Sequence, residues 1–533
     1  MPLASKKRAS KQAYQSLGQL TINGFETPFT QKLDPGNRWV KLASQIPWDQ
    51  IVGVYLKQLR NHSTGASSIN PRVVLGAVMI KHIKNLSDEE TIFEIQENVY
   101  LQYFIGYSSF STEAPFDPSL FVEIRNRLGA SELSQINDQI VSLYNQGLET
   151  KAENELKEES KEANSQQVNT DNDLPPQATC GQSSDQVKQE DSGSNAGHKI
   201  RKGRLLIDAT ACPQDIAYPT DLNLLNDARL KSEQLIDLLF QPGLEGKKPR
   251  TYRQQARKNY LRFAKNRKLS RAQVRKAIAV QLRYLRRNIG HIHLLLNSYS
   301  DIPLKPKEYK YLLVIQELYR QQLHMWNNRS HSVEHRIVSI HQPHVRPIVR
   351  GKARHKTEFG AKLHLSLVNG FAFVDHLSWE AYNEGTLLLD SVEQYKTRHG
   401  HYPKEVLADQ IYCNQENRRQ LKELDIRLLA KPLGRPPAVK PEHVRPGERN
   451  PIEGKFGQAK TGYGLDKIRA RLSHTSQSWI ASIILVLNLV NLARVAPLCL
   501  WPTYSAWSES FWILINHVIL YFKIRENGKL LFQ

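Results

Sequence analysis

Cysteine is scarce in this chain of 533 residues. It has four cysteines, and no two of them lie within 30 residues of each other: Cys180, Cys212, Cys413 and Cys499. The sequence therefore has no C-x-x-C pair, no zinc ribbon and no dense disulfide framework. This usage is typical of a reducing compartment, and we expect a cytoplasmic location.

Nucleotide-binding and membrane signals are also lacking. Neither G-x-x-x-x-G-K-[ST] nor G-x-G-x-x-G occurs, so nothing predicts ATP hydrolysis or a dinucleotide cofactor. The N-terminal stretch MPLASKKRASKQ is basic but has no apolar run behind it, so we expect no secretory signal. Two asparagines and an arginine interrupt the longest apolar stretch, Trp479–Leu500. A buried amphipathic helix is expected there, and no contact with a membrane.

Charge is abundant and unevenly distributed. The net charge is +21, from 73 Lys and Arg against 52 Asp and Glu. Segment 151–198 has ten acids, four lysines and almost no large apolar residue, which predicts an acidic disordered linker over 151–199. Segment 246–290 has sixteen Lys or Arg, four interleaved aromatic residues and no acid, with apolar residues at helical spacing. A solvated charged face is one interpretation, but so many unopposed charges favour nucleic-acid binding by basic helices.

Residues 40–147 have the signals of consecutive short helices. Asn70-Pro71 is an N-cap followed by a proline, Ser87 to Glu90 form a capping box, and Asp117-Pro118 begins another helix. Such a unit is either a helix-turn-helix DNA reader or a dimerisation bundle, and the sequence alone does not separate the two.

From residue 204 the pattern changes to short apolar runs mixed with helical segments. Strands are expected at Leu205–Ile207, Lys362–Leu367, Phe371–Leu377 and Val406–Ala408, with helices at Glu384–His399 and Asn414–Leu424. Asn369-Gly370 predicts a type I′ turn between the second and third strands. Strands mixed with helices indicate an α/β layer.

Two aspartates directly follow apolar runs. Asp208 comes after Leu205–Ile207, and Asp409 comes after Val406–Ala408. An acid at the end of a buried strand either caps the next helix or binds a ligand. If the two strands are neighbours, the two carboxylates lie together and suit a hard divalent cation.

A third acid, Glu453, lies in the segment RNPIEGKFGQAK. One interpretation is a capping box, with Asn450 as N-cap and Glu453 as its N3 partner. The other is functional: Lys460 lies seven residues on, on the same helical face as Glu453, and Arg449 comes just before the helix. A carboxylate between two cations suits a metal ion bridged to a phosphate.

The Arg-x₃-Glu-x₆-Lys spacing resembles the signature of bacterial insertion-sequence transposases of the DDE class. The resemblance covers roughly residues 20–494 apart from the linker. It rests on Asn70–Leu128 as a helical N-terminal transposase domain and on the stretches LLIDAT, GAKLHLSLVNGFAFVDHLSWEAYNE, LADQIYCNQENRR, LGRPP and RNPIEGKFGQAKTGYGL.

The resemblance implies an α/β fold: an RNase H-like mixed sheet of five strands flanked by helices, preceded by an all-α N-terminal domain. It implies a catalytic domain over 200–494, following a DNA-binding or dimerisation domain over 1–150. We expect a basic helical insertion at about 229–335, and an apolar tail of unknown role over 495–533.

The resemblance also implies a site and its ligands. Asp208, Asp409 and Glu453 would be catalytic and would bind Mg²⁺, for which Mn²⁺ would substitute. Arg449 and Lys460 would contact DNA phosphates. We add five cations from the basic segment as DNA-binding candidates: Arg253, Arg257, Lys258, Arg262 and Lys265. The expected partners are double-stranded DNA, as terminal inverted repeats and target, and a second copy of the chain in a homodimer.

The sequence departs from the family pattern at Pro446, where the full signature has a tyrosine. Besides an active transposase, two functions stay open: a catalytically inactive or domesticated DNA-binding descendant, and an RNA-binding or structural protein that uses only its basic helices.

Overall fold

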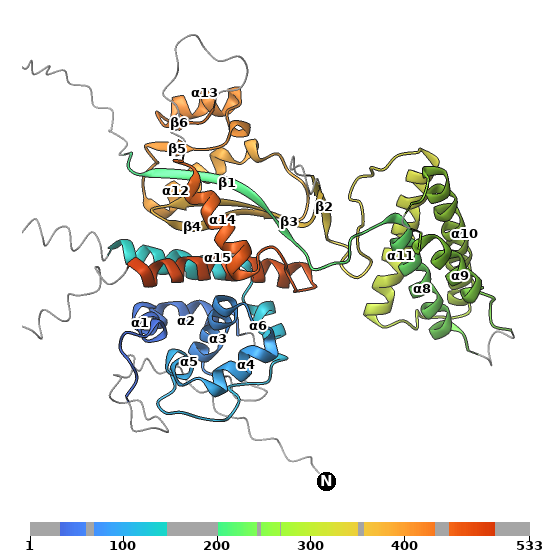
Figure 1. Ribbon diagram of the computed structural model, residues 1–533, viewed down its shortest axis with the longest axis horizontal. Helices are drawn as coiled ribbons and strands as arrows, with labels where there is room; N and C mark the ends of the chain where they lie inside the picture. The colour runs from blue at the N-terminus through green and yellow to red at the C-terminus, as the bar shows by residue number, and fades with distance from the viewer. Residues whose placement is uncertain are drawn as a thin grey trace, which may run out of the picture.

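The computed structural model describes residues 32–59, 69–146, 201–241, 247–266, 268–349, 357–431 and 447–495. The expected linker (151–199), the LGRPP stretch, Pro446 and almost all of the expected tail (495–533) lie outside the described residues. Within the described part, a mixed sheet has helices on both faces, and a separate group of helices extends from one end of it (Figure 1).

The sheet has six strands in the described residues, one more than the resemblance implied. They are β1 (Arg204–Pro213), β2 (Arg346–Val349), β3 (Thr357–Val368), β4 (Phe371–Ser378), β5 (Glu405–Leu407) and β6 (Arg427–Leu429). Their order is β2-β3-β1-β5-β6, and β4 also pairs with β3. The extra strand is β2, which pairs with the first four residues of the long strand β3. The α/β class, a mixed sheet flanked by helices and preceded by helices, is confirmed.

The predicted hairpin is present between β3 and β4. Asn369 and Gly370 both have positive φ, 50° and 83°, as a type I′ turn requires. Strand β1 is longer than predicted. It continues through Asp208 to Pro213, because all eight residues from Leu206 onward pair antiparallel with β3. Asp208 therefore lies inside a strand, and the prediction that it ends one was wrong.

Each face of the sheet is covered by its own helices. The elements after β4 are the 3₁₀ turn η2 (Glu384–Thr386), α12 (Leu388–His399), the 3₁₀ turn η3 (Gln410–Tyr412) and α13 (Gln415–Glu423). They are followed by α14 (Asn450–Tyr463) and α15 (Ser473–Val495). Residues of α12 share one apolar core with Leu205 and Ile207, while residues of α14 share the other with Leu206 and Leu407.

Helix α15 lies between the sheet and the N-terminal helices (Figure 1). It is buried on all sides, so the amphipathic helix predicted here was wrong in that respect. Its segment Ser473–Ala493 is long and apolar enough to cross a membrane, but 78% of an apolar 18-residue stretch within it is buried in the protein. Burial inside the protein explains the apolar composition of α15 without a lipid bilayer. Asn488, which interrupts the apolar run, is fully buried and hydrogen-bonds to the backbone N–H and carbonyl of Ala372 in β4.

The N-terminal helices are α1 (Arg38–Gln45), α2 (Trp48–Lys57), α3 (Pro71–Lys84), α4 (Asp88–Glu97), α5 (Val99–Phe104) and α6 (Leu120–Arg127), and residues 130–146 are also helical. The caps predicted for α3 and α4 are present: Asn70 accepts from the N–H of Arg72, and Ser87 and Glu90 form the capping box. Every residue of α3 from Pro71 to His82 is buried, so this helix is the core of the bundle and has no face to offer DNA.

The remaining helices are inserted between β1 and β2 and form the group at the right of Figure 1. They are α8 (Asp221–Leu239), α9 (Arg253–Ala264), α10 (Arg271–Leu296) and α11 (Pro306–Asn327). These helices have an apolar core of their own. The insertion thus begins at Asp221, somewhat before the expected start near residue 229.

Candidate active site between β1 and the end of β5

The parallel register of β1 and β5 brings Asp208 and Asp409 together. Leu206 pairs with Leu407 in this ladder, and each aspartate lies two residues beyond its leucine. Because side chains alternate along a strand, an offset of two returns to the same face. Both carboxylates are therefore expected on the face that carries α14. Strand β5 ends at Leu407, which leaves the edge of β1 beside Asp208 without a neighbour from β5.

Arg449 connects the two carboxylates. Its Nη2 donates to Asp208 Oδ2 and its Nη1 donates to Asp409 Oδ1, each at 3.1 Å. The Arg449 side chain is 20% exposed, and its Nε is buried without a hydrogen-bond partner among the described atoms. The Arg449 guanidinium therefore lies between the two carboxylates. A metal cation could occupy the same position.

Each aspartate also accepts a hydrogen bond from the backbone N–H of the next residue. Asp208 Oδ1 accepts from the N–H of Ala209, and Asp409 Oδ1 accepts from the N–H of Gln410 as the N-cap of η3. Asp409 is thus an N-cap, as one interpretation of the sequence predicted, but it caps the 3₁₀ turn η3. Asn414 caps the following helix, α13.

Burial raises the pKa of Asp208 to about 6, and the negative charges of Glu384 and Asp409 act in the same direction. The Ala209 N–H and the charge of Arg449 oppose this rise. A buried carboxylate beside other acids is costly to ionise, and such groups gather at functional sites.

Glu453 and Lys460 both lie on α14, which packs Ile452, Phe456 and Ala459 onto the sheet. Arg449 is the N-cap of this helix and makes no side-chain cap bond, so the capping-box interpretation of Glu453 was wrong. The Glu453 side chain is exposed and that of Lys460 is half-buried. Among the residues that the structure describes, no three His, Cys, Asp or Glu side chains are grouped closely enough to hold a metal ion. The structure thus brings two of the three predicted acids together through Arg449 and leaves Glu453 outside their cluster.

Sequence reasoning missed Glu384, the acid whose charge raises the pKa of Asp208. It begins η2, and its carboxylate pairs with Lys362 of β3 at 2.8 Å. Its only sequence signal is its place in the segment AYNE, which the family resemblance includes without singling out the acid.

A buried hydrogen-bond chain supports the loop after Asp409. The hydroxyl of Tyr412, the last residue of η3, hydrogen-bonds to His364 Nε2 at 2.9 Å, and His364 Nδ1 hydrogen-bonds to Ser391 Oγ at 3.3 Å. Tyr412 and His364 are fully buried. Burial lowers the pKa of His364, which keeps the ring neutral and able to accept a hydrogen bond from one neighbour while donating one to the other.

The five predicted DNA-binding cations lie on or directly after α9, away from the acids. Arg257, Lys258, Arg262 and Lys265 are exposed. Arg253 differs, because its guanidinium donates to both carboxylate oxygens of Asp237, at 2.8 and 3.0 Å.

Two parts of the chain match known protein families. Residues 406–490 match the family described as "Transposase DDE domain", and residues 27–127 match "Transposase domain (DUF772)". The first range includes Asp409 and Glu453, and the second includes α1 to α6.

The chain is also similar to "Uncharacterized protein ORF8 in nfe locus" of Rhizobium meliloti, with 32% identity over 121 residues. The aligned segment covers 21% of this chain and 56% of that protein, so the chain spans about half the length of this relative. No solved structure matches the chain. Two segments of the chain are therefore similar to transposase domains, and the chain resembles insertion-sequence transposases of the DDE class.

Proposed function

We propose that this protein is a DDE transposase, which binds the ends of its own insertion sequence and performs Mg²⁺-dependent DNA cleavage and strand transfer. The observation that carries the proposal is the pair Asp208 and Asp409, in matched register around one cation, in a chain with a transposase DDE domain. A second copy of the chain would hold the second element end, and the place of action would be the cytoplasm.

The donor set fits hard divalent cations. Carboxylate oxygens are the ligands that Mg²⁺ prefers, and Mn²⁺ accepts the same set. Asp208 and Asp409 would hold the metal, with Glu453 as the third ligand from α14. Bound ions of this kind activate a water or a 3′-hydroxyl and stabilise the leaving oxygen of a phosphodiester.

The side chains of the protein itself would position the DNA and neutralise negative charge. Arg449 balances the charge of both aspartates in the structure, and its guanidinium would be available to a DNA phosphate if these carboxylates held a metal. Phosphoryl transfer needs mainly such positioning and charge stabilisation, and neither ATP nor a covalent enzyme intermediate.

Metal binding should depend on pH through Asp208. Below its pKa of about 6 a proton competes with the metal, so Mg²⁺ affinity should fall about tenfold for each pH unit lower. Because this pKa is raised in the folded protein, protonation of Asp208 also stabilises the fold, and that stability is lost as pH rises through about 6. Titration calorimetry at several pH values measures the effect. A flat Mg²⁺ affinity between about pH 5 and 7 would contradict the assignment of Asp208 as a ligand.

DNA binding by α9 should depend on salt. Replacing Arg257, Lys258, Arg262 and Lys265 by Gln should weaken binding and flatten its salt dependence by about one unit of slope per lost phosphate contact. Arg253→Gln is the matched control, since Asp237 already neutralises this guanidinium and we expect a smaller change. A slope that stays the same in the fourfold variant would assign α9 another role.

A metal-dependent nicking assay on the element ends tests the proposal against its alternatives. Cleavage of a duplex carrying the terminal repeats, dependent on Mg²⁺, supports it. DNA binding without cleavage would favour the inactive or domesticated descendant, and preference for RNA over duplex DNA would favour the RNA-binding function.

A further inference from the structure

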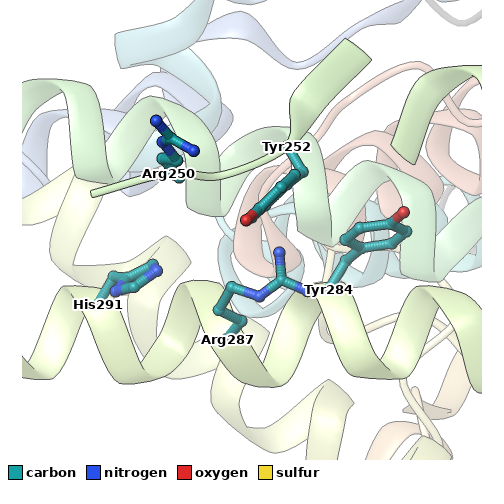
Figure 2. Close-up of a pocket in the computed structure, with 5 residues that line it drawn as sticks. All are labelled: Arg250, Tyr252, Tyr284, Arg287 and His291. Carbon is teal, nitrogen blue, oxygen red and sulfur yellow. The ribbon is translucent and has the colours of Figure 1, made fainter. Parts of the chain in front are cut away.

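The inserted helices contain a surface pocket of about 530 Å³, away from the acids. Figure 2 shows its five lining residues: Arg250, Tyr252, Tyr284, Arg287 and His291. Arg250 and Tyr252 come from the segment before α9, while the other three come from α10. All are aromatic or basic, and none is an acid. The volume lies within the range of roughly 300–1,000 Å³ typical of small-molecule sites.

Two tyrosine rings and one guanidinium are arranged together in this pocket. The Arg287 guanidinium lies over the Tyr252 ring at 4.7 Å and over the Tyr284 ring at 5.4 Å (Figure 2). The Tyr284 hydroxyl accepts a hydrogen bond from Asn259 of α9 at 3.1 Å, which fixes that ring. Tyr252 has a left-handed backbone with φ of 51°, which few residues other than glycine adopt, and it remains 53% exposed. The pocket thus presents an aromatic surface to solvent.

The charge of the pocket is unbalanced. Within the described ranges, neither Arg250 nor Arg287 pairs with a carboxylate, whereas nearby Arg253 is bound by Asp237. Burial lowers the pKa of His291, and its ring also hydrogen-bonds to the backbone of Arg250, so the imidazole is neutral at ordinary pH. The two arginines are therefore available for an anion, and their spread over the pocket fits a phosphate next to a flat ring.

We propose that this pocket binds one nucleotide of DNA whose base is unpaired, with the phosphate on Arg250 and Arg287 and the base stacked on Tyr252 or Tyr284. Aromatic and guanidinium planes recognise bases only when these have left the duplex stack. A paired duplex presents its phosphates to such a pocket but keeps its base faces covered. The exposed cations of α9 lie next to the pocket in the chain and would hold the adjoining backbone. The inference rests on the proposed function, because it assumes that the inserted helices bind DNA.

The test compares two labelled DNAs of equal length, one fully paired and one with a single unpaired thymidine. Binding of the full chain is measured by fluorescence anisotropy in EDTA, so that no cleavage is involved. We expect the wild type to bind the DNA with the unpaired thymidine about tenfold more tightly, as stacking of one base on an aromatic ring provides.

The preference should be lost in Arg287→Gln, which also removes a phosphate contact and should weaken binding of both DNAs. It should also be lost in at least one of Tyr252→Asn and Tyr284→Leu, the variant that removes the ring on which the base stacks. The two tyrosine variants should change affinity for paired DNA little. Asparagine is chosen at position 252 because it tolerates the left-handed backbone. Tyr309→Leu on α11 and Arg271→Gln at the start of α10, both exposed, are matched controls that should keep the ratio of the two affinities.

The possible results separate the two proposals. Equal binding of both DNAs by the wild type, or a preference that survives in all three variants, overturns the nucleotide pocket and leaves DNA binding standing. Failure to bind either DNA overturns the proposed function and the pocket with it. Deoxythymidine monophosphate should compete only weakly, because it lacks the neighbouring phosphates. If it binds as tightly as the DNA with the unpaired thymidine, the pocket takes a free nucleotide instead.

Discussion

Asp208→Asn should reduce DNA cleavage by about three orders of magnitude or more, because it removes a carboxylate that has to bind metal and support several kcal/mol of charge stabilisation in the transition state. Asp409→Asn and Glu453→Gln should behave in the same way. Affinity for DNA should stay within about twofold, since the expected DNA-binding cations of α9 lie elsewhere on the chain. Cleavage of a labelled element end, measured beside anisotropy, gives both quantities on the same preparations.

Asp215→Asn is the matched control for these variants. Asp215 lies just past the end of β1, and its exposed carboxylate pairs with Lys467. Its loss should leave cleavage near the wild-type rate. For Glu453 the experiment is especially informative, because the structure does not place it in a cluster with the two aspartates. If Glu453→Gln cuts DNA normally, Glu384 becomes the candidate for the third acid.

The proximity of Asp208 and Asp409 could be predicted from the sequence only conditionally: both acids follow apolar runs, and they lie together if these runs are neighbouring strands. The register that aligns them could not be predicted, since it depends on how β1 and β5 pair in the folded sheet. The length of β1 was missed for a similar reason. Ala209 to Pro213 form no long apolar run, and their strand structure comes from pairing with β3. The bridging role of Arg449 is also a tertiary effect: sequence assigned its charge to DNA, and the folded chain directs it to the acids.

Local signals were the most reliable guide to the fold. The caps at Asn70 and Ser87 and the turn at Asn369-Gly370 depend on neighbouring residues only, and all three are present. Helix α15 was misjudged because an interrupted apolar run looks amphipathic. Its polar residue Asn488 instead satisfies the backbone of β4 inside the core, a partner 116 residues away that no local pattern reveals.

Glu233→Leu should destabilise the inserted helices by about 3–5 kcal/mol, because it leaves the Arg229 guanidinium buried without a counter-charge. Both side chains are on α8 and nearly inaccessible, with 1% and 5% exposed, and they form an ion pair one helical turn apart. Arg229 also donates to Asn226 Oδ1 at 2.8 Å, which satisfies only part of its hydrogen-bonding capacity. Denaturant unfolding followed by circular dichroism measures the loss.

Two further variants show whether the buried charge is the cause. The double variant Arg229→Met, Glu233→Leu removes both charges and should recover most of the stability, since apolar side chains replace a buried ion pair at little cost. The surface pair of Glu317 and Arg320 on α11 is the matched control, and its removal should cost less than about 1 kcal/mol. If Glu233→Leu alone is as stable as the double variant, α8 tolerates the lone guanidinium and the insertion is looser than its packing indicates.

The same comparison bears on DNA binding, because α8 packs against α10 and α9, which carry the nucleotide pocket and the exposed cations. A stable fold should therefore restore affinity for DNA in the double variant, although neither substitution touches a residue proposed to bind it.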